Sequence, residues 1–393
     1  MIVGARMLAL ACVLAGAPLD AEAHTRSQSV SQWIITDDGA RVVLRVPLLE
    51  ITRLPDAEVT SRADDELDRW LGAYTTSRVG LYAGEERCAV VASPEVLRPA
   101  EDRVGIAWAL RCGPGPRVIE SRFLLDVAPA HLHFAQVRRA GDAAERILSA
   151  REPRWVLGDT PGESEARSLR QYVWLGLTHI ATGVDHLAFL LALLLVGRGG
   201  REVVVVVSGF TIGHSVTLAV AALQLLQPEA PAVEALIGLS IALVACEGVI
   251  TVGSARMWGI AWALGLTLLA GVGSLGVGTV PTISLLGLAL FAGCHFPLLV
   301  RATHPERVRA AVALLFGLIH GLGFGGFLLD VGLPPARVAG ALFGFNVGVE
   351  IGQLILVALA WPILRVLGRG LWREVGLSGV TALGVYWFVS RSM

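Results

Sequence analysis

The pattern of apolar and polar positions changes near residue 170. Residues 24–168 are charged and turn-rich, with no long apolar run. Eight apolar stretches follow, each close to the roughly 20 residues that a helix needs to cross a bilayer. They are 172–196, 203–226, 232–253, 257–278, 281–300, 308–329, 337–361 and 372–390. The pattern therefore predicts a polytopic α-helical membrane protein of about eight spans, preceded by a small separate domain.

Short β-type runs predict the fold of that first domain. The stretch QWIITDDGARVVLRV holds two such runs joined by Asp37-Asp38-Gly39, a typical hairpin turn. Further strands are expected at 85–92, 103–112, 117–127 and 131–138, and DDELDRWLGAY predicts one short helix. Several short strands at this spacing are typical of a small β-sandwich.

The first 23 residues have the features of a cleaved signal peptide. Arg6 precedes an apolar run from Met7 to Gly16, and Ala21-Glu22-Ala23 is a typical cleavage site. An uncleaved anchor is the alternative. The predicted organisation is a signal peptide at 1–23, an extracytoplasmic β-rich domain at 24–168 and a transmembrane domain at 169–393.

Arginines in the loops between spans indicate the orientation. If residues 24–168 lie outside, the predicted inner loops hold nine arginines and the outer loops between spans hold only Arg337. An excess of positive charge marks cytoplasmic loops. The nine are Arg198, Arg201, Arg256, Arg301, Arg307, Arg309, Arg365, Arg369 and Arg373.

Composition agrees with a bilayer as the main partner. Charged residues make up 17% of the chain, against about 25% in ordinary soluble domains. The net charge of -1 gives no reason to expect a nucleic-acid partner. Cys88 and Cys112 fall together in the exported domain, where an oxidising compartment favours a disulfide. Two free buried thiols are the alternative.

Ionisable residues inside the predicted spans are the candidate chemistry, because such groups are costly in hydrocarbon. Several lie near the middle of their spans, one lies nearer the outside and two lie nearer the cytoplasm, so that together they form a ladder. The mid-span residues are His186, His214, His320 and Glu350; the outer one is His179; the inner ones are Glu247 and His295.

Helical spacing places His179, Thr182 and His186 on one face, at i, i+3 and i+7. Asp185 is a ligand itself or orients a neighbouring imidazole. A lone membrane histidine such as His295 is either an interhelical hydrogen-bond donor or a ligand. As a set, these residues exceed what packing requires and predict a pathway for a metal ion or for protons.

The types of side chain narrow the cargo. Imidazole and carboxylate suit divalent nickel, cobalt, zinc and iron, whereas copper(I) prefers thiolate or thioether. Only Cys246 and Cys294 lie in the spans, and methionine is scarce there. Copper(I) is therefore disfavoured.

Five motifs carry a family resemblance. HIATGVDH at 179–186 resembles the H-P-x-x-G-x-D-H signature of HupE/UreJ-type nickel and cobalt permeases, with Ile180 in place of the proline. Further stretches resemble the larger subfamily that has an exported N-terminal domain. They are FTIGHSVTL (210–218), VEALIGLSIALVACE (233–247), FGLIHGLGF (316–324) and FNVGVEIGQL (345–354).

The resemblance implies secondary, ATP-independent movement of Ni²⁺, Co²⁺ or a related cation such as Zn²⁺ or Fe²⁺. It also implies a bacterial inner membrane, an indirect link to nickel enzymes, and a transporter rather than an enzyme. His179, Asp185 and His186 inherit the signature positions, while His214, Glu247, His320 and Glu350 match other motif positions. Loss of the proline predicts a straighter first helix and relaxed selectivity, and the additional stretch 257–301 gives His295 no counterpart.

The exported domain offers candidate ligands for a second metal site. After cleavage His24 would offer its α-amine and ring nitrogen, and His131 and His133 share a strand face at i, i+2. Two surface histidines on an edge strand are the alternative. The rival functions are an intramembrane metalloenzyme with a fixed zinc, although no H-E-x-x-H is present, and a metal sensor or assembly factor.

Overall fold

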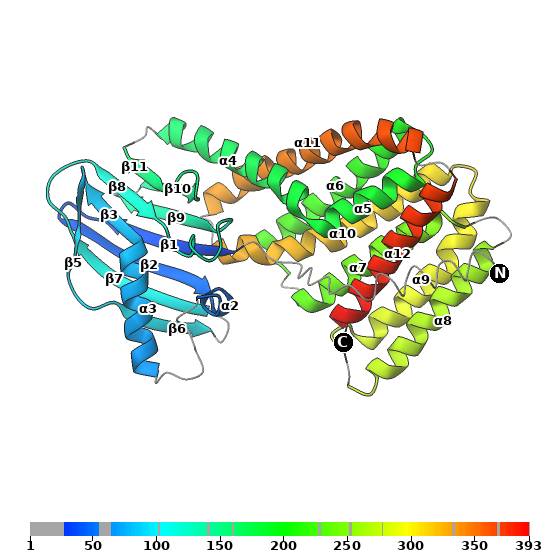
Figure 1. Cartoon of the computed structure of the whole chain (residues 1–393), viewed down its shortest axis with the longest axis horizontal. Coiled ribbons are helices and arrows are strands. Elements are labelled where there is room, and N and C mark those ends of the chain that lie inside the picture. Colours follow the sequence, from blue (N-terminus) through cyan, green and yellow to red (C-terminus); the bar gives the residue numbers. More distant parts are fainter. Residues whose placement is uncertain are drawn as a thin grey trace. The chain divides into compact units, whose positions relative to one another are not determined.

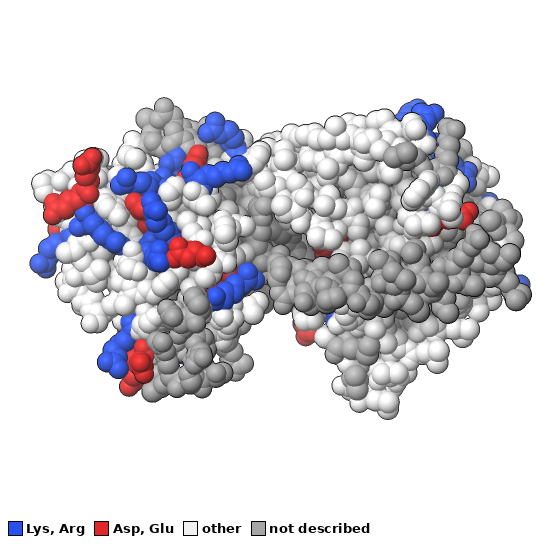
Figure 2. Space-filling view, viewed as in Figure 1, with Lys and Arg blue, Asp and Glu red and all other residues white. Residues whose placement is uncertain are grey.

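The structure is a computed structural model that describes residues 27–54, 64–100, 103–139, 142–158, 161–226, 229–250, 254–276, 278–331, 335–367 and 370–392. The expected signal peptide at 1–23 and His24 lie outside the described residues. The described residues fall into a β unit within His24–Gln171 and a helical unit within Tyr172–Leu329 and Val338–Met393. In Figure 2, blue and red side chains gather on the β unit, whereas the described surface of the helical unit is mostly white.

The β unit contains two sheets (Figure 1). The larger has the order β10-β9-β1-β2-β7-β5, with β6 also paired to β7, and the smaller has the order β11-β8-β3-β4. Strands β1 and β9 are parallel, and the other pairs are antiparallel. The strands are β1 (Gln28–Ile35), β2 (Gly39–Pro47), β3 (Val79–Ala83), β4 (Glu86–Arg87), β5 (Ala89–Val90), β6 (Glu95–Ala100), β7 (Arg103–Arg111), β8 (Arg117–Ser121), β9 (Leu132–Arg139), β10 (Asp142–Leu148) and β11 (Arg154–Leu157).

One hydrophobic core joins the two sheets. Trp33 and Leu44 of the larger sheet, Leu81 and Ile119 of the smaller, and Leu71 of helix α3 (Asp64–Arg78) belong to one buried cluster. The short helix α2 (Leu48–Ile51) follows β2. The predicted sandwich-like, strand-rich domain is therefore confirmed.

Individual strands were predicted with uneven success. The hairpin across Asp37-Asp38 is confirmed, since β1 and β2 pair on either side of it. The strand expected at 117–127 ends at Ser121, because the chain turns there and Leu124 adopts a positive φ of 56°. Strands β3, β6, β10 and β11 were not predicted.

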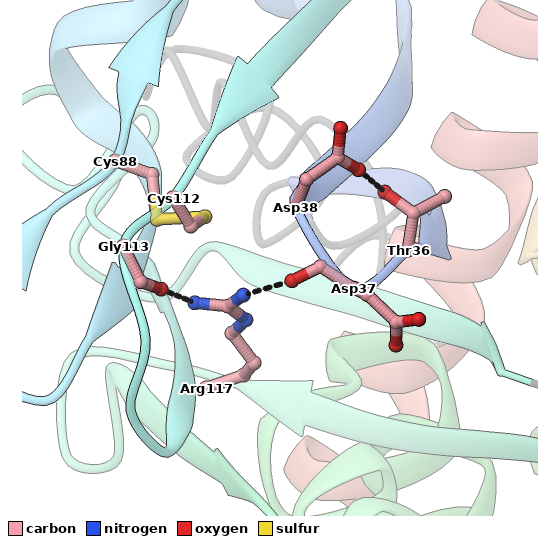
Figure 3. The surroundings of a disulfide bond; sticks show 7 residues. All are labelled: Thr36, Asp37, Asp38, Cys88, Cys112, Gly113 and Arg117. Carbon is pink, nitrogen blue, oxygen red and sulfur yellow. Dashed lines mark hydrogen bonds between the residues drawn. A yellow bond between two sulfur atoms is a disulfide. The ribbon is translucent and has the colours of Figure 1, made fainter.

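A disulfide joins Cys88 and Cys112 near the first hairpin (Figure 3). The backbone N–H of Cys112 donates to the carbonyl oxygen of Asp38 at 2.9 Å. The Arg117 guanidinium donates to the carbonyl oxygens of Gly113 at 2.6 Å and Asp37 at 2.8 Å. The bridge therefore holds together a corner that these hydrogen bonds already order.

Each predicted span coincides with a helix or a helix pair. Five helices are long and apolar enough to cross a membrane, or six spans if the bent pair α4–α5 counts as one. The predicted spans at 308–329 and 372–390 coincide with α10 and α12, which do not meet these criteria over their described residues. The helices are α4 (Pro161–Thr182), α5 (Val184–Val196), α6 (Gly200–Ala222), α7 (Ala230–Glu247), α8 (Ala255–Gly273), α9 (Thr282–Arg301), α10 (Pro305–Val331), α11 (Pro335–Leu367) and α12 (Leu371–Ser392).

The first span is broken and not straight. Helices α4 and α5 meet at an angle of 70° around Gly183. Gly183 has an extended backbone and precedes the first residue of α5. The expectation that Ile180, in place of proline, straightens this span is therefore wrong. The break occurs at the glycine, three residues further on.

Helix α7 is the most buried helix of the bundle. Every residue from Ile237 to Glu247 is buried. In contrast, Leu264 and Leu268 of α8 and Leu290 of α9 are largely exposed, as expected for side chains that face lipid.

Two pairs of helices repeat one another in sequence and in packing. GLTH at 176–179 of α4 matches GLIH at 317–320 of α10, and GFTIG at 209–213 of α6 matches GFNVG at 344–348 of α11. A Cβ at Gly176 would lie 2.1 Å from the carbonyl oxygen of Phe345, and a Cβ at Gly317 would lie 2.1 Å from that of Phe210. Helix α4 therefore packs on α11 as α10 packs on α6.

The repeat is inverted. Helices α4 and α11 run in the same direction, since Gly348 approaches Val173 and Gly352 approaches Leu177. Only three residues separate α10 from α11, and so short a connection makes two helices antiparallel. Helix α4 and its counterpart α10 therefore run in opposite directions. The two differ at one place, because α4 breaks at Gly183 whereas α10 continues to Val331.

Candidate metal-binding site

Four of the predicted histidines meet inside the helical unit. The ring centroids of His179 on α4 and His186 on α5 lie 4.6 Å apart. His214 on α6 lies 6.4 Å from His179 and 6.1 Å from His186, and His320 on α10 lies 5.5 Å from His186. His179 does not form a separate outer step of a ladder, because the bend at Gly183 brings its ring beside His186.

Ring nitrogens in this cluster lack hydrogen-bond partners among the described residues. Both nitrogens of His186 and of His214 are buried without one, as is Nδ1 of His320. Ser240 donates to the carbonyl oxygen of Ile237 at 2.7 Å, so it accepts from Nε2–H of His320 at 2.9 Å. This contact leaves Nδ1 of His320 with a free lone pair, the arrangement that metal-binding histidines usually show.

The four histidine rings lie close to one another but do not surround a common point. Among the described residues, no three His, Cys, Asp or Glu side chains already surround a point that could hold a metal ion. With metal–nitrogen bonds of about 2.1 Å, two histidines on one ion have ring centroids roughly 5 Å apart. The observed separations of 4.6–6.4 Å lie around this value and extend above it.

A layer of aromatic rings lies directly beside the histidines on the same helices. Phe189, Phe210 and Phe316 are three or four residues from His186, His214 and His320, respectively. Phe189 lies 4.7 Å from Phe210 and 6.5 Å from Phe316, and Phe210 lies 4.9 Å from His320. These rings therefore form an apolar layer on the side of the histidines that faces the arginine-rich loops.

The other predicted acids lie at the margins of the cluster. Glu350 on α11 accepts a hydrogen bond from Ser208 on α6 at 2.7 Å, while its second oxygen has no partner among the described residues. Ser208 lies six residues before His214, which is about 9 Å along a helix. Asp185, in the first turn of α5, lies 3.8 Å from Arg391 of α12.

Glu247 and His295 belong to a separate buried group. His295 Nε2 lies 2.8 Å from Glu247 Oε1, and Arg309 Nε lies 3.1 Å from Glu247 Oε2. Arg309 also reaches Glu202 Oε1 at 2.8 Å. From the sequence pattern, Arg309 was assigned to a predicted inner loop, and Glu202 was not identified as a candidate site residue. Pro305 and Glu306, which are typical of a helix start, were the signal that Arg309 lies inside a helix.

His133 of β9 and His131, which directly precedes that strand, lie inside the β unit, with exposed fractions of 2% and 1%. Strand β9 lies between β10 and β1, so these histidines are not surface groups on an edge strand. Ser27, which directly precedes β1, and Ser29 of β1 contact the two nitrogens of His131 at 2.7 and 2.8 Å. Ser29 and Ser31 contact those of His133 at 2.8 and 2.7 Å. Burial lowers the pKa of each histidine to about 3.

The hydrogen bonds of this serine–histidine ladder run in one direction. At one end, Trp33 donates to Ser31 at 2.7 Å, and at the other, Ser27 donates to Glu50 at 2.5 Å. An indole N–H only donates and a carboxylate only accepts. Each serine therefore donates to the next residue, and each histidine donates from Nδ1 and accepts at Nε2. No ring nitrogen is left for a metal while the ladder is intact.

A family model described as HupE / UreJ protein matches residues 159–283 and 285–391, which is more than half of the chain. The match covers all four clustered histidines. No curated protein shows a significant sequence match to the chain.

Proposed function

The chain belongs to the HupE/UreJ family, and we propose that it is a secondary, ATP-independent permease for a divalent transition-metal ion, Ni²⁺ or Co²⁺. The family is associated with nickel and cobalt transport, which favours a transporter over an enzyme. The multi-pass chain would lie in a bacterial inner membrane, with the β unit outside and metal moving inward.

The single observation that carries this proposal is the histidine cluster. Buried polar groups are nearly always hydrogen-bonded, yet five ring nitrogens of His186, His214 and His320 have no partner among the described residues. Neutral imidazole nitrogens bind divalent nickel, cobalt and zinc. A cation that exchanges its hydration shell for one lone-pair nitrogen of each ring would use acceptors that the protein leaves open.

The inverted repeat supports transport rather than a fixed metal site. Secondary transporters commonly have inverted repeats, a broken helix and a binding site where the halves meet. Here His179 and His320 are counterparts in the two halves, and the break at Gly183 lies between His179 and His186. If α10 became the broken helix and α4 became the continuous one, the site would open to the opposite side of the membrane.

Purified protein in liposomes tests the proposal. With a set pH gradient, we expect accumulation of Ni²⁺ or Co²⁺ above that of empty liposomes, and weaker accumulation of Zn²⁺ and copper. His186→Gln abolishes it, whereas His304→Gln, which changes an exposed histidine, leaves it unchanged. Tight metal binding without flux, or unchanged flux in His186→Gln, would refute a permease that uses this cluster.

A further inference from the structure

Arg309 lies where an inner metal site would be expected. Its guanidinium is held between the carboxylates of Glu202 on α6 and Glu247 on α7, and Glu247 is held in turn by His295 on α9. The side chains of Glu247 and His295 are 3% and 2% exposed, and that of Arg309 is 10% exposed. Two carboxylates from different helices therefore face a single guanidinium inside the bundle.

The group lies on the helices that carry the histidine cluster. Glu202 shares α6 with His214, Glu247 shares α7 with Ser240, and Arg309 shares α10 with His320. The separations along these helices are 7 to 12 residues, or about 10–18 Å. The same helices therefore present imidazoles at one level and carboxylates at a level nearer the arginine-rich loops.

Arg309 and Glu247 stand between two cavities. One, of about 20 Å³, is lined by Leu193, Val206 and Val244, and the other, of about 620 Å³, is lined by Arg198, Leu299 and Arg373. Val196, Glu247 and Arg309 line both cavities. Leu193 lies seven residues beyond His186 on α5. The narrow cavity therefore lies toward the histidines and the wide one lies toward the predicted cytoplasmic side.

We propose that Glu202, Glu247 and His295 form an exit site for the cargo cation, and that Arg309 occupies this site as a tethered cation until the cargo displaces it. The inference rests on the proposed function for the identity of the cargo. Two carboxylates and one imidazole suit a divalent first-row metal. A doubly charged ion has twice the charge of the guanidinium to attract this pair of carboxylates, and the wide cavity of about 620 Å³ would accept the displaced side chain.

The fixed charge of arginine suits this role. A guanidinium stays protonated at all physiological pH values, so Arg309 leaves the carboxylates only by moving and not by losing a proton. Its removal would leave two buried carboxylates without a counter-ion, which is strongly unfavourable unless a cation from solution takes its place.

Equilibrium binding of Ni²⁺ to the purified full chain in detergent tests the exit site without requiring flux. At Ni²⁺ concentrations well below those that displace the guanidinium of Arg309 in the wild type, we expect Arg309→Gln to bind one more Ni²⁺ per chain than the wild type. The extra ion persists when His186→Gln is added and is lost when Glu247→Gln is added. Arg307→Gln, which changes an exposed arginine on the same helix, binds no extra ion. A folded Arg309→Gln protein with the wild-type stoichiometry would overturn the proposal.

A measurement on the wild-type chain keeps the proposal testable if Arg309→Gln does not fold. Phenylglyoxal modifies accessible guanidinium groups, and mass spectrometry of the digested protein reads the modification of each arginine. Saturating Ni²⁺ should increase the modification of Arg309 at least threefold, with Arg307 unchanged and with no effect of Mg²⁺. An unchanged Arg309 signal would overturn the exit site, even if the His186→Gln result upheld the permease.

Discussion

Histidines are buried in both units of the chain, but their hydrogen bonding is opposite. In the β unit, all four ring nitrogens of His131 and His133 contact serines that lie in β1 or directly before it. In the helical unit, both nitrogens of His186 and of His214 have no hydrogen-bond partner among the described residues. Burial alone therefore does not separate the two sets, whereas their hydrogen bonding does.

The difference teaches how to recognise a binding histidine. Leaving a buried donor or acceptor unpaired costs about 1–3 kcal/mol, so a set of unpaired nitrogens persists only where the protein gains something else from it. The serine–histidine ladder has no unpaired ring nitrogens, and it acts as a structural element that fixes β1 against β9. The membrane cluster keeps open positions that a cation can fill.

The largest expected effect comes from replacing an unpaired histidine by an apolar residue of similar size. His214→Leu should reduce Ni²⁺ flux in liposomes to the level of empty liposomes. It should leave the thermal midpoint of the detergent-solubilised protein unchanged or raised, because it removes unpaired buried nitrogens. A clear fall in the midpoint would instead show that His214 has a structural role, and the comparison between the two sets would break down.

The second expected effect comes from breaking the ladder at its centre. Ser29 contacts both histidines, so Ser29→Ala leaves one nitrogen of each unpaired and destabilises the β unit by about 2–4 kcal/mol. Hydrogen exchange of the β1 and β9 amides in the intact chain, read by mass spectrometry, measures this loss. Thr36→Ala, which removes an exposed hydroxyl from the adjoining turn, is the control. Equal protection in both variants would mean that the ladder contributes little.

Patterns along the sequence predicted the elements well and their contacts poorly. The eight apolar stretches all coincide with helices or a helix pair, because hydrophobicity and length are local properties. The contact between the rings of His179 and His186 depends on the bend at Gly183. The ion pairs of Arg309 with Glu202 and Glu247 depend on how three helices pack. These are tertiary features that no local pattern specifies.

A stronger signal for the ladder was present in the sequence. His131 and His133 alternate at i, i+2, and so do Ser27, Ser29 and Ser31. Two strands with polar residues at the same period predict a buried polar ladder if the strands pair, but β1 and β9 are parallel neighbours about 100 residues apart. Local spacing gives the face of a strand and not its partner.

The smallest expected effect is the pH dependence of the β unit. Each ladder histidine has a folded-state pKa of about 3, against about 6.5 when unfolded. Between these values the unfolded chain binds more protons than the folded chain, so stability is fully present above about pH 6.5 and falls as the pH is lowered. From pH 7 to pH 6 the two histidines together should cost about 1.4 kcal/mol, rising toward about 1.4 kcal/mol per pH unit for each histidine below that. Hydrogen exchange of the β1 and β9 amides, corrected for intrinsic exchange rates, measures this dependence of stability on pH.

The prediction requires histidines that stay neutral inside an intact ladder. A flat pH profile would show that water or protons reach them, and the contrast with the membrane cluster would then lose its physical basis.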